Sequence, residues 1–294
     1  MASVDTGEEF DPGKLIVACG GDNNYAMPVA VTLFSLIESQ PDEVEITCYL
    51  LSGGMTFSNK QNIERVLRKV RHNLNIEWLE FDLSQFTGMH RSAHLTEATL
   101  MRLLLPEKLP QIKRLLYIDC DVLVRGDVRP FYQHPFNDTY IVGVQDFYIP
   151  TTGIYGHTDL NIDPDLPYFN AGVMMMNLDL LRKADLIDPM LRLLRKYPEF
   201  HDQDGLNALI GGRWQHTNYK WNLQIGWRGL DTLPPSDVKS QLIADREHLF
   251  ENAQIIHFNT SHKPWKSGLL DPFRPLYHSA LQRSEWFTPS QYRR

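Results

Sequence analysis

Short runs of consecutive apolar residues alternate along the chain with longer stretches whose apolar residues recur every three or four positions. Runs of the first kind are typical of strands buried on both faces, and stretches of the second kind are typical of helices that pack on them. The runs predict strands at 14–19, 45–51, 76–81, 115–118, 139–145, 168–177 and 253–258. The periodic stretches predict helices at 28–39, 58–71, 95–105, 178–197 and 201–210. Because strands and helices alternate, we expect an α/β fold with a mostly parallel sheet and right-handed crossovers.

Individual residues predict where some of these helices begin and end. Ser58 suits the N-cap of the helix 58–71, since its hydroxyl can accept a hydrogen bond from a free backbone N–H of the first turn. Pro106 is expected to end the helix 95–105, because proline has no backbone N–H to donate. The polar segment 151–167 is long for a connection, and loops of that kind are often lids over binding sites.

One buried strand ends in two carboxylates. The apolar run 115–118 is followed by Asp119 and Asp121, with Cys120 between them. Side chains two residues apart on a strand point the same way, and open α/β sheets bind ligands at the carboxyl ends of their strands. Two carboxylates held close together repel each other unless a cation or a proton lies between them. We interpret this Asp-x-Asp segment as a divalent-metal site facing a cleft, with a polar turn as the alternative.

Polar residues also follow the first and the last predicted strands. Asp22, Asn24 and Tyr25, in a loop that begins with two glycines, are suited to contact a base or a ribose. The loop lacks the G-x-G-x-x-G pattern, and a plain turn is the alternative. His257 ends the last strand and is either a core histidine or a third metal ligand. Lys263 follows at a distance that would let it hold a phosphate.

Other segments have residues that suit a sugar. Arg102 is a lone cation in an apolar helix, so it must reach solvent or pair with an anion such as Asp119 or a phosphate. The segment 170–172 has small residues that would let a sugar lie close to the backbone. The acidic and amide side chains at 202–204 open a helix, where they are either caps or the lining of a polar pocket. Three tryptophans either bind sugar or, as is commoner, fill the core: Trp214, Trp221 and Trp227.

The composition excludes several classes of protein. With 294 residues, 43% hydrophobic and 22% charged, the chain is long enough for a sizeable core. A net charge of −7 argues against a nucleic-acid binder. No apolar run approaches a membrane span, and the segment 1–13 is acidic and polar, unlike a secretory signal. We expect a cytoplasmic protein with at most a peripheral contact at the inner face of the membrane. The three cysteines fall in apolar segments and are expected to be buried free thiols: Cys19, Cys48 and Cys120.

Brought together, these residues predict one site for a nucleotide and a metal. Mixed oxygen and nitrogen ligands beside a diphosphate favour Mn²⁺ or Mg²⁺, and the histidine favours Mn²⁺. A divalent cation stabilises a leaving diphosphate. With the sugar-compatible segments, this combination suggests glycosyl transfer from a nucleotide sugar.

The chain resembles the retaining glycosyltransferases of family 8, which include bacterial lipopolysaccharide galactosyl- and glucosyltransferases and glycogenin. The resemblance covers roughly 15–268. Its markers, in chain order, are Gly21-Asp22-Asn23-Asn24-Tyr25-Ala26, Arg102, Leu116-Tyr117-Ile118-Asp119-Cys120-Asp121-Val122-Leu123-Val124, Phe169-Asn170-Ala171-Gly172-Val173, Asp202-Gln203-Asp204, Ile256-His257-Phe258 and Lys263-Pro264-Trp265.

The resemblance implies a single GT-A domain, which is a Rossmann-like α/β fold, over 14–268. A flexible tail at 1–13 precedes it, and a C-terminal extension at 269–294 follows. It also implies transfer of a hexose from UDP-galactose or UDP-glucose, with retention at the anomeric carbon. The acceptor would be a glycan, a lipid-linked sugar or a small molecule, and the oligomeric state stays open.

The resemblance implies roles for individual residues. The Mn²⁺ ligands, with Mg²⁺ as the alternative cation, would be Asp119, Asp121 and His257. The residues around the uridine and the diphosphate would be Asp22, Asn24, Tyr25, Lys263 and Thr260, the last where a glycine is expected. The residues around the donor sugar would be Arg102, Asp146, Asn170, Ala171, Gly172 and Asp202.

Two mechanisms give retention at the anomeric carbon. In one, a side chain attacks the sugar and forms a covalent intermediate. In the other, the acceptor hydroxyl enters on the face from which the diphosphate departs. Gln203 matches the residue under the anomeric carbon, and an amide is a poor nucleophile. We therefore favour the same-face route, with Gln203, Asp204 and Asp146 as the catalytic group.

Two other functions remain open from the sequence. A sugar nucleotidyltransferase also uses an α/β sheet and metal-binding carboxylates, but it would need a basic loop, and 20–25 contains no cation. A self-glycosylating priming protein like glycogenin would need a target tyrosine, and no segment marks one out among the twelve tyrosines.

Overall fold

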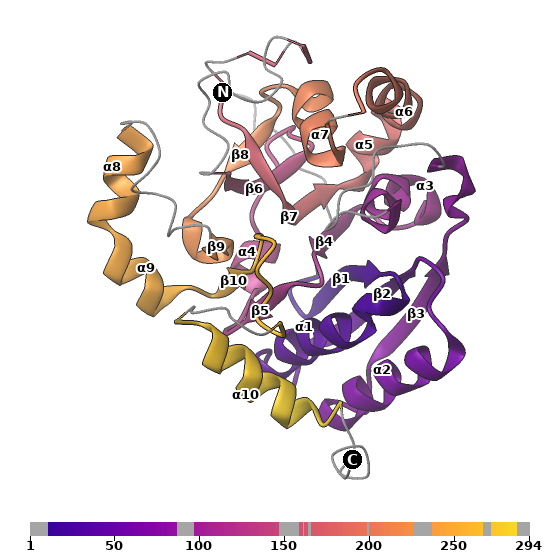
Figure 1. The fold of residues 1–294 in the computed structure, drawn as a ribbon, viewed down its shortest axis with the longest axis vertical. Helices are drawn as coiled ribbons and strands as arrows, with labels where there is room; N and C mark the ends of the chain where they lie inside the picture. The colour runs from indigo at the N-terminus through magenta and orange to yellow at the C-terminus, as the bar shows by residue number, and fades with distance from the viewer. Residues whose placement is uncertain are drawn as a thin grey trace.

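The structure is a computed structural model, and it describes residues 11–86, 97–146, 159–160, 162–163, 166–198, 200–225, 237–266 and 272–286. Its centre is a mostly parallel sheet covered by helices on both faces, which confirms the predicted α/β fold (Figure 1). The strands of this sheet, among the described residues, are β1 (Lys14–Gly21), β2 (Glu45–Ser52), β3 (Asn75–Glu80), β4 (Arg114–Ile118), β6 (Ile141–Gln145), β7 (Phe169–Asn177) and β8 (Trp214–His216).

The strand order is β3-β2-β1-β4-β7-β6-β8. The first four strands run parallel, whereas β7 is antiparallel to both of its neighbours, β4 and β6. The carboxyl end of β4 therefore lies beside the middle of β7, where Ile118 pairs with Val173. This arrangement brings the Asp-x-Asp segment after β4 next to the small residues 170–172.

A second, smaller sheet contains the last described strand. Its order is β5 (Val122–Val124), β10 (Ile255–His257) and β9 (Leu223–Gln224). The strands β5 and β10 are antiparallel, and Val122 pairs with His257. Since β5 begins one residue after Asp121, this pairing carries the histidine back to the Asp-x-Asp segment.

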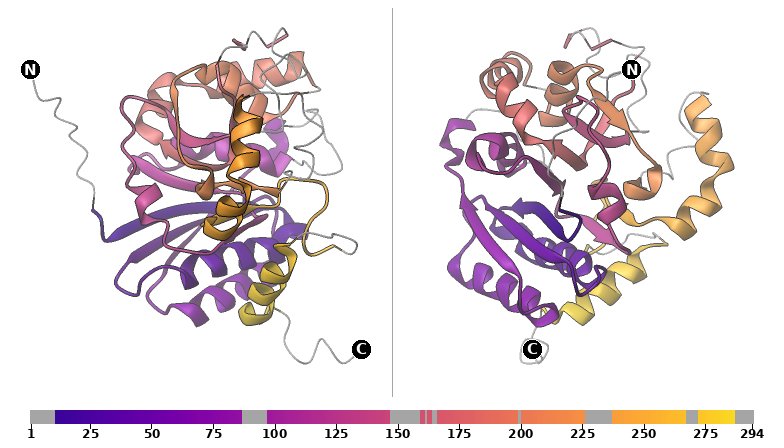
Figure 2. Two further views of the ribbon diagram at one scale, coloured as in Figure 1. Left: turned by 90° about the vertical axis from the view of Figure 1, so that its left-hand side faces the viewer. Right: turned by 180° about the vertical axis from the view of Figure 1, so that it is seen from behind.

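Helices cover both faces of the main sheet, and two apolar cores follow from this. Alternate β1 residues Leu15 and Val17 lie in one core with α1 and α2, and Ala18 lies in the other core with α5, α6 and α7. Two further views show α10 beside α1, and α8 with α9 as an arm at the edge (Figure 2). The α-helices are α1 (Ala26–Glu38), α2 (Phe57–Val70), α3 (Leu105–Lys108), α4 (Arg129–Tyr132), α5 (Leu178–Ala184), α6 (Ile187–Lys196), α7 (Asp202–Ile210), α8 (Asp237–Ala244), α9 (Arg246–Asn252) and α10 (Arg274–Ser284). The 3₁₀ helices are η1 (Asn23–Tyr25), η2 (Leu83–Phe86), η3 (Glu97–Leu104) and η4 (Tyr219–Trp221).

Three predicted helix boundaries are wrong. The N-cap of α2 is Thr56, whose hydroxyl accepts a hydrogen bond from Asn59 N–H, and Ser58 lies inside the helix. Pro106 does not end a helix. It lies in the first turn of α3, where its missing N–H costs nothing, and the stretch before it is the 3₁₀ helix η3. The predicted helix 178–197 is two helices, separated at Asp185 (φ 48°), and aspartate tolerates this left-handed conformation better than most residues.

Further expectations concern the cysteines, membrane spans and segments outside the described residues. Cys19 and Cys48 are buried free thiols as expected, but Cys120 is partly exposed, because it lies in the turn between β4 and β5. No helix in the described ranges combines the length and apolar character needed to cross a membrane. Most of the predicted lid 151–167, residues 1–10 of the predicted tail 1–13, and Trp227 lie outside the described residues.

Candidate active site

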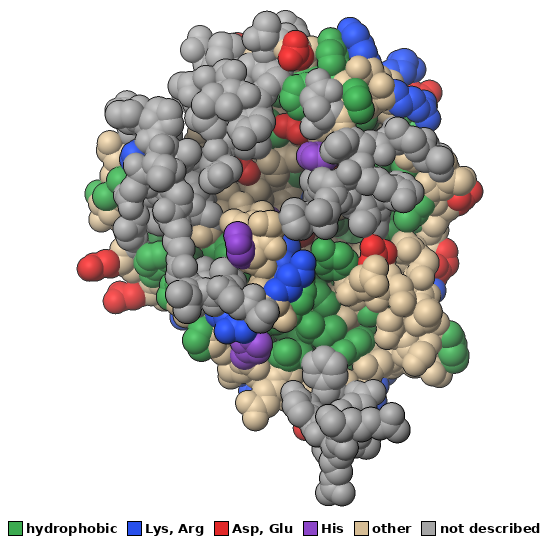
Figure 3. Space-filling view, in the orientation of Figure 1, with side chains coloured by type: hydrophobic (Ala, Val, Ile, Leu, Met, Phe, Trp, Pro, Cys, Tyr) green, Lys and Arg blue, Asp and Glu red, His purple; other side chains and the backbone are tan. Residues whose placement is uncertain are grey.

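A cavity of about 420 Å³ lies at the carboxyl ends of β1 and β4. In the space-filling view, this face of the molecule is hollowed near its centre, with acidic side chains at the margin (Figure 3). The predicted site residues that line the cavity are Asp22, Tyr25, Arg102, Asp119, Asp121, Asp146, Asn170, Asp202, Gln203, Asp204, His257, Thr260 and Lys263. Segments far apart in the sequence therefore meet in one place.

Asp119, Asp121 and His257 form a cluster with the spacing of a metal site. One possible ligand atom from each residue lies within 4.8 Å of the others. His257 Nε2 is 3.3 Å from Asp121 Oδ1 and 3.9 Å from Asp119 Oδ2. Asp121 Oδ1 is buried and accepts no hydrogen bond from the described residues. A buried carboxylate oxygen of this kind requires a partner, and two oxygens with one imidazole nitrogen fit a divalent cation such as Mn²⁺.

Lys263 is the cation beside Asp121. Its Nζ donates to Asp121 Oδ2 at 2.5 Å and to the Phe258 carbonyl at 2.8 Å. Burial raises the pKa of Asp121, but Lys263 and His257 together outweigh burial and hold this pKa well below its usual range. Burial likewise lowers the pKa of Lys263, and Asp121 outweighs that effect and raises it. Both groups are therefore charged at neutral pH.

Arg102 is the cation beside Asp119, and it pairs with anions instead of reaching solvent. Its Nε donates to Asp202 Oδ2 at 2.5 Å, and its Nη1 donates to Asp119 Oδ1 at 3.1 Å and to the Ala171 carbonyl at 2.6 Å. The Tyr117 hydroxyl also donates to Asp119 Oδ1, at 2.7 Å. Burial lowers the pKa of Arg102, but the two carboxylates outweigh it and raise this pKa above the usual value.

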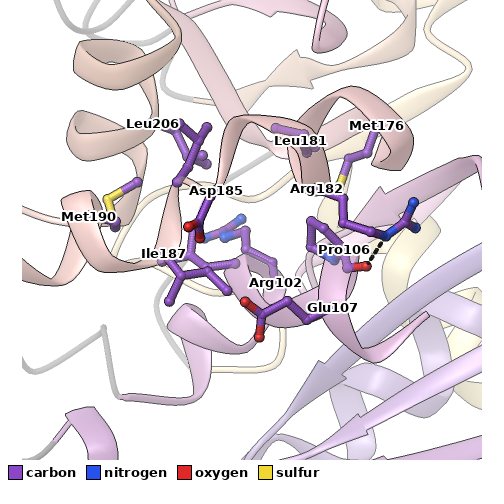
Figure 4. Close-up of a pocket in the computed structure, with 12 residues that line it drawn as sticks. Arg102, Pro106, Glu107, Met176, Leu181, Arg182, Asp185, Ile187, Met190 and Leu206 are labelled. Carbon is purple, nitrogen blue, oxygen red and sulfur yellow. Dashed lines mark hydrogen bonds between the residues drawn. The ribbon is translucent and has the colours of Figure 1, made fainter. Parts of the chain in front are cut away.

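The surroundings behind Arg102 are mainly apolar. A small cavity of about 40 Å³ lies between η3, α3, α5, α6 and α7, and Ile187, Met190 and Leu206 are among its lining side chains (Figure 4). A volume of this size holds one or two waters and no sugar. Glu107 and Asp185 also line this small cavity, and the carboxylates that bond to the guanidinium are Asp119 and Asp202.

Amide and carboxylate groups form the opposite side of the large cavity. Gln203 Nε2 donates to Asp146 Oδ2 at 3.1 Å, and Gln203 Oε1 accepts from Ala171 N–H at 2.9 Å. Asn170 Nδ2 donates to the same Asp146 oxygen at 2.9 Å. The side-chain oxygen and nitrogen of Gln203 therefore both have hydrogen-bond partners, and so do those of Asn170, whose Oδ1 accepts from Gly172 N–H at 3.1 Å.

The start of α7 combines capping with site residues. His201 and Asp204 form a capping box, and the Asp204 carboxylate also accepts from the Tyr168 hydroxyl at 2.6 Å. This geometry supports the capping interpretation for Asp204. Asp202 and Gln203 lie in the same turn and contact Arg102 and Asp146 across the cavity.

The loop after β1 contributes fewer side chains than expected. Asp22 and Tyr25 line the cavity, but Asn24 is exposed and does not. Asp22 Oδ1 caps η1 by accepting from Asn24 N–H at 2.8 Å. Asn23 faces α2 instead, where it accepts from Thr56 N–H at 2.9 Å. The packing of β1 on β2 explains the glycine at position 20, since a Cβ there would lie 2.3 Å from the Leu51 carbonyl oxygen of β2.

Ala171 and Gly172 are buried and do not line the cavity. A Cβ at Gly172 would lie 2.2 Å from His257 Cε1 and 2.8 Å from Asp119 Oδ2. The small residue at this position therefore makes room for the side chains of Asp119 and His257. Thr260 does line the cavity, and its hydroxyl bonds within its own loop, to the His262 carbonyl at 3.3 Å.

Several residues of the site were missed by the sequence reasoning. Tyr117 could have been found, since it lies two residues before Asp119 on the same face of the strand. Tyr168, His201 and the buried Asn222 have no pattern around them that distinguishes them. Two of the three tryptophans are core residues: Trp214 packs on Phe169, and Trp221 stacks on Phe131.

Comparison with known proteins gives consistent matches. The model of glycosyl transferase family 8 matches residues 16–268. General stress protein A of Bacillus subtilis (strain 168) is 29% identical over 281 residues, covering 93% of this chain and 94% of that protein. Lipopolysaccharide 1,2-glucosyltransferase of Escherichia coli (strain K12) is 25% identical over 301 residues, covering 97% of this chain and 81% of that protein. The crystal structure of the galactosyltransferase LgtC, in complex with donor and acceptor sugar analogs, shares the fold, with a TM-score of 0.80 and 24% identity over 91% of this chain and 95% of that one.

Proposed function

Since this chain belongs to glycosyltransferase family 8, we propose that it transfers a hexose from a UDP-sugar to an acceptor hydroxyl, with retention and with the help of Mn²⁺. The observation that supports this best is the cluster of Asp119, Asp121 and His257, in which the buried Asp121 Oδ1 lacks a hydrogen-bond donor among the described residues. The hexose is glucose or galactose. A relative named above is a lipopolysaccharide 1,2-glucosyltransferase, and LgtC is a galactosyltransferase.

The cavity offers different chemistry at its two ends. Asp22 and Tyr25 are suited to hold the uridine, and the Lys263 ammonium is suited to hold the diphosphate. When bound, the cation supplies positive charge that stabilises the diphosphate as it leaves. At the other end, Arg102, Asp146, Asn170 and Asp202 present the donors and acceptors that hexose hydroxyls require.

For the transfer step, we propose that the acceptor hydroxyl attacks on the face from which the diphosphate departs. Gln203 Oε1 already accepts from Ala171 N–H, and Gln203 Nε2 donates to Asp146. An amide held in this way is suited to stabilise positive charge near the anomeric carbon through its dipole and is a weak attacking group. The acceptor proton would pass to a departing diphosphate oxygen.

We also propose that the protein works in the cytoplasm, because its three cysteines are free thiols, which suits a reducing compartment. The acceptor class that fits is a glycan, a lipid-linked sugar or a small metabolite.

The test is UDP release by the purified protein against a panel of UDP-sugars, with Mn²⁺, with Mg²⁺ and with EDTA. We expect release from UDP-glucose or UDP-galactose that requires Mn²⁺ and stops with EDTA. His257→Ala should abolish it, whereas His262→Ala, an exposed histidine of the same loop, should not. Wild-type turnover by His257→Ala in EDTA would refute the metal assignment. Release of pyrophosphate from UTP and a hexose 1-phosphate, with no UDP released from the panel, would instead indicate a nucleotidyltransferase.

A further inference from the structure

Asn222 is a fully buried amide next to the proposed metal site. Its side chain is 0% exposed and lies directly after η4. A buried amide is costly unless its oxygen and its nitrogen both find partners. Asn222 Oδ1 lies 3.1 Å from His257 Nδ1, and Asn222 Nδ2 lies 2.9 Å from Asn170 Oδ1. The residue thus connects the histidine of the metal cluster to the sugar end of the cavity.

The donors and acceptors in this chain of hydrogen bonds can be assigned by starting from Asp146. The Asp146 carboxylate can only accept when ionised, so Asn170 must point its NH₂ group at it, at 2.9 Å. The Gly172 N–H can only donate, and it lies 3.1 Å from the other end of the same amide, so this end is the oxygen. Two independent partners therefore agree on the orientation of Asn170.

This orientation determines the state of His257. Because Asn170 presents its oxygen, Asn222 must donate its NH₂ to it and present its own oxygen to His257. His257 Nδ1 must then carry a hydrogen, which leaves a lone pair on Nε2 when the imidazole is neutral. Nε2 faces Asp121 Oδ1 at 3.3 Å, and that oxygen is the buried atom without a donor in the described chain. A lone pair and an unbonded carboxylate oxygen that face each other both suit a cation between them.

We propose that Asn222 is a positioning residue that selects the Nδ1–H form of His257, aims Nε2 at the cation, and fixes Asn170 at the sugar end. The cation itself rests on the proposed function, but the hydrogen position on His257 does not. Groups that hydrogen-bond to metal ligands typically change metal affinity by about 10- to 100-fold when they are removed.

The first test measures the protonated nitrogen of His257 by ¹⁵N NMR on histidine-labelled protein without metal, with His257→Ala to assign the resonance. We expect Nδ1–H in the wild type and in Asn222→Asp, whose carboxylate still accepts. Asn222→Leu, which removes the acceptor, should shift the population toward Nε2–H. Asn207→Leu is the matched control, because Asn207 is a buried amide that bonds to the Phe169 backbone and should leave His257 unchanged. An Nε2–H histidine in the wild type would overturn the proposal without any variant.

The second test measures Mn²⁺ affinity in the presence of UDP by calorimetry. Asn222→Leu should weaken it about 10- to 100-fold. Asn222→Asp should stay within about 3-fold for Mn²⁺ but raise the KM for the donor sugar, since a carboxylate cannot donate to Asn170. Equal losses in the two variants would overturn the proposal in favour of a merely structural amide. If the wild type neither binds UDP nor turns over a UDP-sugar, the proposed function fails, while the NMR result still decides the role of Asn222.

Discussion

Asp119 and Asp121 lie two residues apart in one turn, yet their side chains contact different parts of the sequence, one before the turn and one far after it. The Asp119 side chain is 27% exposed and contacts Arg102 and Tyr117, which precede it in the sequence. The Asp121 side chain is 12% exposed and contacts His257 and Lys263, which follow much later.

The two cations also differ in chemistry. The Arg102 guanidinium donates hydrogen bonds to Asp119, Asp202 and a backbone carbonyl. Because the group is planar, it can use several donors at once. Lys263 is a point charge on a flexible stem with one carboxylate partner, Asp121, among the described residues. The Asp119 side is therefore held by several directional bonds, and under the proposed function we expect Lys263 on the Asp121 side to exchange this carboxylate for a diphosphate oxygen.

The largest effect should come from breaking the fixed side. Arg102→Met would leave Asp202, which is 2% exposed, buried without its counter-ion, so we expect the free energy of unfolding to fall by about 3–5 kcal/mol. Urea unfolding without metal measures it. Arg283→Met is the control: its pair with Glu38 is exposed, and we expect a loss of at most about 1 kcal/mol. Equal losses in the two variants would contradict the comparison.

A smaller effect should come from an uncharged group of the same site. Gln203→Ala removes an amide dipole but no charge, so we expect kcat to fall roughly 10²-fold while binding of Mn²⁺ and UDP is kept. Steady-state kinetics and calorimetry on one preparation measure both. A complete loss of turnover, as in His257→Ala, would instead favour Gln203 as the attacking group.

Lys263→Met should change two affinities in opposite directions. Removing the ammonium from Asp121 should tighten binding of Mn²⁺ alone a few-fold, because a competing positive charge is gone. The same change should weaken UDP binding about tenfold, because a charge-assisted hydrogen bond to the diphosphate is lost. Calorimetric titrations measure each affinity, with Lys266→Met as the exposed control. Weaker binding of both ligands would mean that Lys263 serves only to hold the loop.

The smallest effect should come from the support beneath both carboxylates. The single hydrogen of the Thr32 hydroxyl, on α1, faces the carbonyl oxygens of Cys120 and Val122, at 2.8 and 2.7 Å, and the hydroxyl oxygen accepts from Val122 N–H at 3.3 Å. Thr32→Val should lower the free energy of unfolding by about 1 kcal/mol, and Thr32→Ser, which keeps the hydroxyl, should lower it less. A change in Mn²⁺ affinity larger than the change in stability would show that the turn itself moves.

The sequence predicted the fold wherever a strand was long enough to have a pattern. β1, β2, β4 and β7 are each apolar runs, since both faces of the sheet are covered. The short strands β5, β8 and β9 were not predicted, because two or three residues show no periodicity. Pro106 and Ser58 were misjudged for another reason: the same residue type can begin a helix, end it or lie inside it.

The site residues could be predicted where charged or polar side chains come at the ends of buried strands. Asp119, Asp121 and His257 were expected together and lie together, because β5 and β10 pair. Asn24 was expected in the cavity but is exposed and does not line it, since its loop turns as η1. Asn222 could not have been expected, because a buried asparagine owes its role to partners that only the fold brings near.

The pairing of Val122 with His257 has a consequence for biosynthesis. Ribosomes make a chain from its amino terminus at about 5–20 residues per second, and a domain generally folds as a unit. Every described strand of the main sheet precedes Thr217, so all of these strands are synthesised before β10. His257 and Lys263, the two partners of Asp121, are synthesised only with the last part of the chain. An unfinished chain would hold the two carboxylates without either partner, and we expect ion binding to mark a nearly complete molecule.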